Sequence, residues 1–550
     1  MTNRITTVGF SALYTGGSYY GAILEGIYRI AQRRGVRIVA VQYQTEVPLP
    51  DDLGQDVIDG WIVVLDDNRI AQLARSGRPV VGISSSPDRP MVQPDNYGGM
   101  VAAVQHLVAH GHQRIAFVGP PDNSDVHMRF SGYQAALAAA GIACDPELVI
   151  NVSNELEDAG GAGARALIAR SLPCTAAAIA TDRNAFGFME AMQAAGVRIP
   201  EDMAITGFDD MIEAQTCTPP LTTVRQRFDS LGIAALDLLL ELIGGTEPPA
   251  APVGVLTPLI VRRSCGCDRS LSAVVHLGDL ESASGLRARL TQDLVTLLLY
   301  PLPFDPAQSP LDIWPALTTL LVCLDAALAG EALPDVDDIT LAWHQATGIV
   351  TDIDVLNAIM DQLEWTGFKL AKSQGDAAAE TRMLDTLQLL RKELVRARVA
   401  IESALVSYMS RVMTANNNMN TFLLRAEHLN RPSLDWMQFT QARWGCLGLW
   451  KHVGDSLVIE LAEIYDSEGK ATLAVGERIA PANFPPVDLL AEANPISRTQ
   501  VLSLSTSQRN WGVLVLSGNL QPITGAIGDP VDIWIEMMGG ALDRSALLGE

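Results

Sequence analysis

Residues 176–210 read AAAIATDRNAFGFMEAMQAAGVRIPEDMAITGFDD. Two short apolar runs, 176–181 and 204–208, flank a segment at 184–196 whose apolar residues recur at helical spacing. A strand, a helix and a second near-continuous apolar strand are typical of a parallel sheet that is covered on both faces. The stretch therefore predicts a β-α-β unit, and an aspartate follows each of its two strands.

The same alternation runs through the first 268 residues of the chain. It predicts further strands at 5–10, 36–43, 58–65, 79–84 and 114–119, and further helices at 19–34, 98–110, 129–140, 159–170 and 229–244. The strands fall into two groups, which indicates an α/β domain with two lobes, each a doubly wound parallel sheet. Ligands of such sheets bind beyond the carboxyl ends of the strands, so residues just after each strand are the first candidates for a site.

Six motifs in residues 1–268 resemble the ligand-binding sensor domain of the LacI/GalR family, which has the type I periplasmic-binding-protein fold. They are Asp95-Asn-Tyr-Gly-Gly99, His106-Leu-Val-Ala-His-Gly-His-Gln-Arg-Ile115, Arg129-Phe-Ser-Gly-Tyr133, Ala180-Thr-Asp182, Ile205-Thr-Gly-Phe-Asp-Asp210 and Pro219-Pro-Leu-Thr-Thr-Val-Arg-Gln226. Their order and spacing match that domain throughout. The resemblance implies a small polar ligand, a sugar or nucleoside-like molecule, bound between the two lobes.

The resemblance assigns ligand contacts to Arg129 and Asp209. A guanidinium that opens a helix after a strand can donate two hydrogen bonds to vicinal hydroxyls or to a carboxylate. Asp182 is either a second carboxylate for the ligand or the cap of the helix that follows it. The rings of Tyr19 and Tyr20 either stack on a sugar or pack within their lobe.

Four further residues complete the candidate lining of the ligand site: Ser84, Asp125, Thr181 and Phe228. Ser84 and Thr181 stand where some members of the family carry an aspartate and an amide. The polar contacts to the ligand are therefore expected to differ in this chain.

A metal site is not expected from the sequence. Cys265 and Cys267 could be thiolate ligands, but the other cysteines are scattered and no histidine pair lies near them in the sequence. His106, His110 and His112 fall on one helix and the turn after it, and we interpret them as cap and packing residues.

Catalysis and a cofactor are not expected either. No Gly-x-Ser-x-Gly elbow, no His-Glu-x-x-His helix and no Walker loop occurs in the sequence. The glycine run at 160–163 follows no strand and precedes no lysine, so it predicts a loop-to-helix junction rather than a phosphate cradle.

The composition excludes several partners. With 63 acidic and 39 basic residues the formal charge is −24, so direct nucleic-acid binding by these 550 residues is not expected. No apolar stretch reaches the roughly 20 residues that a membrane-spanning helix needs. The start at Met1 has no secretory signal, and seven cysteines suit a reducing compartment, so we expect a cytoplasmic protein.

Residues 269–375 are rich in leucine and alanine and predict a helical region, followed at 376–415 by a coiled-coil-like signalling helix. Apolar residues of this helix alternate spacings of four and three, at Met383, Leu387, Leu390, Leu394, Ala397, Ile401, Ala404 and Tyr408. This seam predicts a homodimer. The alternative is a helix that packs inside its own domain.

Residues 416–550 predict a separate α+β module. It comprises a helix at 434–442, strands at 445–452, 458–465, 471–475, 500–505 and 511–517, and a helix at 530–548. The stretches Trp444–Trp450 and Asn510–Leu516 resemble a GAF-like sensor domain. In proteins of that kind such a module passes a signal to an output unit.

Together these features predict a non-catalytic sensor in which ligand-induced closure of two lobes passes through the helices to the GAF-like module and an output unit or partner protein. One alternative is a LacI-family transcription regulator whose DNA-binding part is absent or upstream, because the first strand is expected by Ile5. A solute-binding receptor for transport is another. A dimerisation scaffold with an empty cleft is the third.

Overall fold

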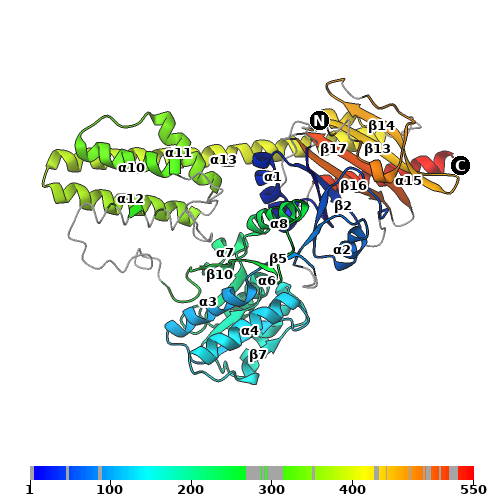
Figure 1. Cartoon of the computed structure of the whole chain (residues 1–550). Helices are drawn as coiled ribbons and strands as arrows, with labels where there is room; N and C mark the ends of the chain where they lie inside the picture. Colours follow the sequence, from blue (N-terminus) through cyan, green and yellow to red (C-terminus); the bar gives the residue numbers. More distant parts are fainter. Residues whose placement is uncertain are drawn as a thin grey trace. The chain divides into compact units, whose positions relative to one another are not determined.

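The computed structural model describes residues 5–44, 49–84, 89–267, 287, 290, 291, 294, 314–349, 353–425, 433–440, 442–469, 472–486, 490, 497–506, 509–518 and 530–549. The chain divides into two compact units. Figure 1 labels their helices and strands. Unit 1 comprises residues 1–94, 227–255 and 407–550, and unit 2 comprises residues 95–226 and 256–406. We call 5–94 with 227–255 the first lobe, and 95–226 with 256–267 the second lobe.

The second lobe is built on a six-stranded sheet in the order β12-β10-β9-β8-β6-β7. Its strands are β6 (Ile115–Gly119), β7 (Val149–Asn151), β8 (Ala176–Ile179), β9 (Ala204–Asp209), β10 (Thr222–Arg225) and β12 (Leu259–Ile260). All are parallel to their neighbours except β12, which runs antiparallel to β10. The β-α-β unit predicted at 176–210 is confirmed, because β8 and β9 pair in parallel on either side of α6 in the sequence.

Helices cover both faces of this sheet (Figure 1). They are α3 (Asn96–Ala109), α4 (Ser124–Ala139), α5 (Glu157–Ala169) and α6 (Asp182–Ala194), with the short α7 (Glu213–Thr216) after β9. Phe117 of β6 packs in the core with α3 and α4, and its neighbour Val118 packs in the core with α5 and α6. Successive side chains of a strand point to opposite faces, so burial of both faces explains why the strands are apolar throughout.

The first lobe has a second parallel sheet. Its strands are β1 (Thr7–Ala12), β2 (Arg37–Gln42), β3 (Gly60–Val64), β4 (Val80–Ile83), β5 (Met91–Pro94) and β11 (Val253–Val255), and its helices are α1 (Ala22–Arg34), α2 (Asp67–Ala74) and α8 (Phe228–Ile243). Helices α1 and α8 touch backbone to backbone, because a Cβ on Gly26 would lie 2.0 Å from the Asp229 carbonyl oxygen. The short strands β5, β7, β10, β11 and β12 were missed by the sequence analysis.

The C-terminal strands extend the sheet of the first lobe. They are β13 (Ala442–Val453), β14 (Ser456–Asp466), β15 (Arg478–Ile479), β16 (Arg498–Ser505) and β17 (Asn510–Gly518), with α15 (Pro530–Gly549) after them. β16 pairs in parallel with β2, Thr499 lying opposite Val39, which produces one eleven-stranded sheet in unit 1. The prediction of a module with its own sheet missed this pairing, which covers the edge of β2 and satisfies its backbone groups.

Two details of the C-terminal prediction are wrong. The expected strand at 471–475 is not formed at its described residues 472–475, and the short β15 follows at 478–479 instead. Gly476, between the two, has a φ of 90°, a conformation that suits a turn rather than a strand. The expected helix at 434–442 is a single 3-10 turn, Asp435–Phe439.

The helical part of unit 2 contains α10 (Trp314–Ala329), α11 (Val336–Ile349), α12 (Ile353–Gln374) and the beginning of α13 (Ala377–Arg425). The first five seam residues are Met383, Leu387, Leu390, Leu394 and Ala397, and all are buried in one core with residues of α10, α11 and α12. The expectation of an intermolecular seam is therefore wrong at these positions, and the alternative of packing within the domain is correct. The side chains of Ile401, Ala404 and Tyr408 lie outside the described ones.

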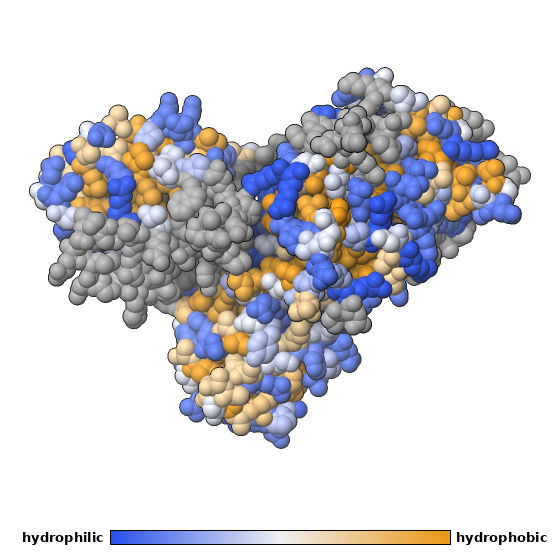
Figure 2. Space-filling model, in the orientation of Figure 1, coloured by the Kyte–Doolittle hydropathy of each residue, from blue (hydrophilic) through white to orange (hydrophobic). Residues whose placement is uncertain are grey.

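Within the described ranges, no helix combines the length and the apolar character that crossing a membrane requires. On the face of the molecule drawn in Figure 2, hydrophilic and apolar residues are intermixed.

Candidate functional site

Arg129, in the second turn of α4, is the centre of the site in the second lobe. Its side chain is buried, and it is held by partners from two other parts of the lobe. Nε donates to Asn96 Oδ1 (2.8 Å) and Nη1 donates to the Ala180 carbonyl oxygen (2.6 Å). The guanidinium carbon also lies 3.8 Å from the centre of the Phe208 ring. These contacts fix the orientation of the guanidinium before any ligand arrives.

Asp209 ends β9 and brings a carboxylate to this arginine. Its Oδ1 accepts a hydrogen bond from Gln226 Nε2 (2.6 Å) and lies 3.5 Å from Arg129 Nη1. Asp209 and Asp210 have φ angles of 126° and 59°, which non-glycine residues rarely adopt. Buried ion pairs hold this turn, since the Asp210 carboxylate binds Arg262 Nη2 (2.6 Å). Such strain, held by its surroundings, is typical of functional sites.

Asp182 does not cap the helix that follows it. The cap of α6 is Thr181, whose Oγ1 accepts from the Asn184 backbone N–H (3.2 Å). Asp182 is fully buried, and its carboxylate accepts from Thr223 Oγ1 (2.5 Å) and the Met211 backbone N–H (2.9 Å). These two bonds tie the turn after β9 to β10.

Burial shifts the pKa values of both carboxylates upward. Burial raises the pKa of Asp182, and the neighbouring Asp209 raises it further. Burial also raises the pKa of Asp209, although Arg129 and Gln226 oppose that shift. A ligand that donates hydrogen bonds to Asp209 would stabilise its ionised form.

Asn96 and Gln226 are site residues that the sequence analysis missed. Both belong to motifs quoted for the family resemblance, where their polar side chains were the available signal. Among the described residues, nothing accepts a hydrogen bond from the buried Asn96 Nδ2. Likewise, in the part of the chain that the structure describes, Arg129 makes its hydrogen bonds through Nε and Nη1 and none through Nη2. Two donors therefore remain for a ligand.

The structure does not join Asp125 to this cluster. Asp125 lies half-buried in the first turn of α4, and its backbone N–H donates to Asn123 Oδ1 (2.8 Å). Within the described residues it forms no hydrogen bond or ion pair with Arg129 or Asp209.

The other four candidates lie in the first lobe. They are the aromatic residues Tyr19, Tyr20 and Phe228, and Ser84. Tyr19 and Tyr20 lie in a π-helical turn, Gly17–Gly21, before α1. The Tyr19 ring meets Tyr20 and Phe228 edge to face, with centroids 5.0 and 4.8 Å apart. These rings therefore contact one another within the lobe, while both tyrosines remain partly exposed. Ser84 has a φ of 51°, and its N–H donates to the Val92 carbonyl oxygen.

Comparison with known proteins agrees with this architecture. Residues 104–265 match the family model of a periplasmic binding protein-like domain. The HTH-type transcriptional regulator MalR of Streptomyces coelicolor is 37% identical over 207 residues, which are 36% of this chain and 59% of MalR. The HTH-type transcriptional regulator CelR of Thermobifida fusca is 30% identical over 262 residues, which are 45% of this chain and 76% of CelR.

Through its first half, the chain belongs to the LacI/GalR family. A solved complex of the transcriptional regulator CelR with cellobiose is 30% identical, with a TM-score of 0.42 over 48% of this chain and 86% of that one. The family model of a periplasmic binding protein-like domain matches residues 104–265, so the second lobe of this LacI/GalR-family protein has the α/β periplasmic-binding fold. The motifs that predicted this fold are those that build the Arg129 site. The chain spans 59% of the length of MalR.

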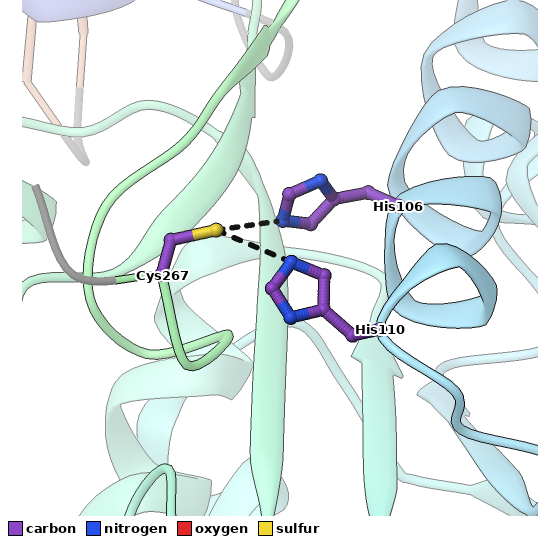
Figure 3. A group of neighbouring side chains, drawn as sticks. All are labelled: His106, His110 and Cys267. Carbon is purple, nitrogen blue, oxygen red and sulfur yellow. Dashed lines mark hydrogen bonds between the residues drawn. The ribbon is translucent and has the colours of Figure 1, made fainter. Parts of the chain in front are cut away.

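A second cluster of this LacI/GalR-family lobe lies at the C-terminal end of α3. His106 and His110 point toward Cys267, which lies beyond β12 (Figure 3). Cys267 Sγ is 3.2 Å from His110 Nε2 and 3.6 Å from His106 Nε2, and Cys265 Sγ is 3.2 Å from the same His106 atom. The expectation that no histidine pair lies near these cysteines is wrong for the folded chain. The residues after β12 lie beside the end of α3, which carries both histidines.

The third histidine of this motif takes no part in the cluster. His112 Nδ1 instead pairs with Thr175 Oγ1 at 2.9 Å. Burial, assisted by the neighbouring His110, lowers the pKa of His106 to about 4. His106 is therefore a neutral imidazole at neutral pH, with a lone pair available on one ring nitrogen.

Proposed function

We propose that this protein is a non-catalytic regulator whose second lobe binds a small hydroxyl-rich molecule, a sugar or a nucleoside-like compound. The observation that supports this most is the buried Arg129, oriented by Asn96 and Ala180 beside Asp209. Ala180 and Asp209 lie at the carboxyl ends of β8 and β9, where open parallel sheets bind their ligands.

A vicinal diol satisfies both charged groups at once. One hydroxyl accepts a hydrogen bond from the guanidinium of Arg129, and its neighbour donates one to Asp209. Asn96 Nδ2 supplies a further donor for a third oxygen. Sugars and nucleosides share the vicinal diol, so the proposal rests on that group and not on one named compound.

We assign the response to the control of transcription, because MalR and CelR are named as transcriptional regulators and align with this half of the chain. A formal charge of −24 disfavours DNA contact by these 550 residues. We therefore infer that the signal reaches DNA through a partner or another polypeptide segment. The proposal includes a cytoplasmic location and a homodimer.

Contacts inside unit 1 support a second part of the proposal, a relay to the GAF-like C-terminal strands. Thr15 lies within hydrogen-bond distance of Gln42 Oε1 (3.0 Å) and Gln500 Nε2 (3.5 Å). Arg498 of β16 forms an ion pair with Glu25 of α1 (2.7 Å). A shift of β2 or α1 in the first lobe would thus act directly on β16.

A thermal-shift screen of the full chain against aldoses, disaccharides and nucleosides tests the proposal. Compounds that raise the melting temperature would then be titrated by calorimetry. We expect hits that carry a vicinal diol and lose affinity when that diol is removed. Stabilisation only by compounds without hydroxyls, or by none of the panel, would contradict the proposed ligand class.

A further inference from the structure

We propose that His106, His110 and Cys267, with Cys265 as the fourth ligand, form a binding site for a zinc ion. Nε2 of each histidine and Sγ of Cys267 all lie within 4.8 Å of one another. These atoms come from two segments that are distant in the sequence, the end of α3 and the turn after β12. The site is separate from the Arg129 cluster and does not depend on the ligand proposed for it.

The spacing of the donor atoms is close to that of a tetrahedral site. Zinc binds sulfur at about 2.3 Å and imidazole nitrogen at about 2.0–2.1 Å, so tetrahedral coordination places S and N roughly 3.6 Å apart. The Cys267 Sγ distances to the two histidines are 3.6 and 3.2 Å, and Cys265 Sγ lies 3.2 Å from His106 Nε2. Cys265 Sγ lies outside the group of mutually close donor atoms and contacts Thr222 Oγ1 at 3.0 Å, so it has to turn toward the ion to serve as the fourth ligand.

The local sequence presents these donors in pairs. His106 and His110 are four residues apart, which puts them on one side of α3, where their rings lie 4.7 Å apart. Cys265 and Cys267 flank Gly266, whose φ of 94° reverses the chain between them. Figure 3 shows both imidazoles and the Cys267 thiol directed toward one point.

The chemistry of the donors selects the metal. Thiolate and imidazole suit zinc, whereas calcium and magnesium require oxygen ligands. The group contains two histidines and a cysteine and no carboxylate. Its members range from the half-buried His106 and Cys267 to the exposed His110, so an ion has an entry path from solvent.

Bound zinc would fasten the end of the second lobe to α3. Cys267 is the last residue of the second lobe that the structure describes, and Asn96 at the other end of α3 holds Arg129. The metal is thus expected to stabilise the folded lobe, because an ion that binds only the folded state raises its stability.

The test uses the full chain, purified under reducing conditions, stripped with a chelator and titrated with zinc against a chromophoric competitor. Cobalt replaces zinc in a parallel titration, where a thiolate charge-transfer band reports the Cys267 ligand. We expect one zinc ion per chain. Zinc affinity should be at least about 100-fold weaker in H110A and in C267S, because removing a metal ligand should reduce affinity more than removing a residue that only supports a ligand.

Matched controls are H127A, an exposed histidine on α4, and C144S, a free thiol outside the cluster. Both should bind zinc within about twofold of the wild type, because distant sites act independently. His110 is exposed, so H110A should keep the fold, which circular dichroism would verify. Absence of stoichiometric zinc, or equal affinity in H110A and C267S and the wild type, would overturn the proposal. So would a cobalt spectrum without a thiolate band.

Discussion

Arg129 is 3% exposed, and its Nε and Nη1 contact acceptors on three separate elements. Asn96 begins α3, Ala180 follows β8 and Asp209 ends β9. Because Ala180 and Asp209 follow neighbouring strands of the sheet and Asn96 belongs to a helix, the arginine joins three elements of the lobe. One residue thus connects the local chemistry of the site to the fold that surrounds it.

Replacement of Arg129 by alanine tests its role. R129A should weaken binding of a hit from the diol screen at least tenfold, since truncating one partner of a buried charge pair costs about 2–5 kcal/mol. Calorimetric titration measures the change. R198A is the matched control, because Arg198 pairs with Asp202 on the surface of the same lobe and should leave affinity unchanged. Equal affinity in R129A and the wild type would remove Arg129 from the site.

Asp182 gives a prediction about pH. The pKa of Asp182 is raised in the folded state, so the folded protein favours the protonated carboxyl. The stability that this protonated carboxyl contributes is present at low pH. It is lost as pH rises above the ordinary carboxyl pKa of about 4 toward the raised value. D182N keeps a neutral side chain that can accept from the Met211 N–H and donate to Thr223 Oγ1. The variant should therefore gain stability relative to the wild type as pH rises.

Chemical denaturation of D182N and the wild type at several pH values between 4 and 8 measures this difference. D125N serves as the control, because Asp125 is half-buried at a helix start and outside the cluster. A constant difference in unfolding free energy between D182N and the wild type across the series would refute the prediction.

At the scale of elements, helix α13 shows how one apolar stripe allows two structures. The heptad spacing of Met383 through Ala397 suits a coiled coil as well as an intramolecular bundle. In the structure the stripe is covered by α10, α11 and α12, and its flank forms ion pairs with α12, where Arg391 Nε lies 2.7 Å from Glu364 Oε1. The stripe is thus a core and not an interface at these positions.

Leu390 and Leu394 distinguish the two arrangements. They are 0% and 3% exposed, so the double change L390E/L394E places two carboxylates in the bundle core and should unfold it. We expect a loss of at least about 3 kcal/mol, comparable to large core truncations, seen as a loss of helical circular dichroism on heating. V399E on the same helix is the control, because Val399 is 54% exposed.

Light scattering completes this experiment. If the double variant kept its helical signal and melting temperature but changed from dimer to monomer, the stripe would be an interface after all. A folded bundle in V399E together with a melted one in the double variant would support the intramolecular core.

At the scale of the whole molecule, charge and sheet continuity set the limits on function. The formal charge of −24 opposes the phosphate backbone of nucleic acids, and no basic excess in either half offsets it. Within unit 1, the eleven-stranded sheet unites the first lobe with the C-terminal strands, so these parts are expected to respond together.

The charge predicts that the 550-residue chain by itself will not retain duplex DNA at physiological salt. A gel-shift experiment with random-sequence duplex and micromolar protein, at low and physiological salt, measures this directly. A basic DNA-binding domain provides the positive control. Salt-sensitive retention of the duplex by the chain would show that a local patch outweighs its net charge.

The sequence alone determined the regular parts of this protein, because spacing reveals which face of an element is apolar. Strands 176–181 and 204–208, the helix between them and the polar residues after each strand were predictable in this way. Arg129 and Asp209 followed from the family motifs. These features depend on neighbours within a few turns of the chain.

Only the tertiary structure decided which surface covers each apolar face and which polar groups meet. The pairing of β2 with β16 joins residues more than 400 positions apart, and Cys267 meets His110 across 157 positions. Asn96 reaches Arg129 from another helix. The local spacing of apolar residues does not reveal such partners, because hydrophobic burial is non-directional. Any complementary surface, in the same chain or in a second copy, can cover an apolar face.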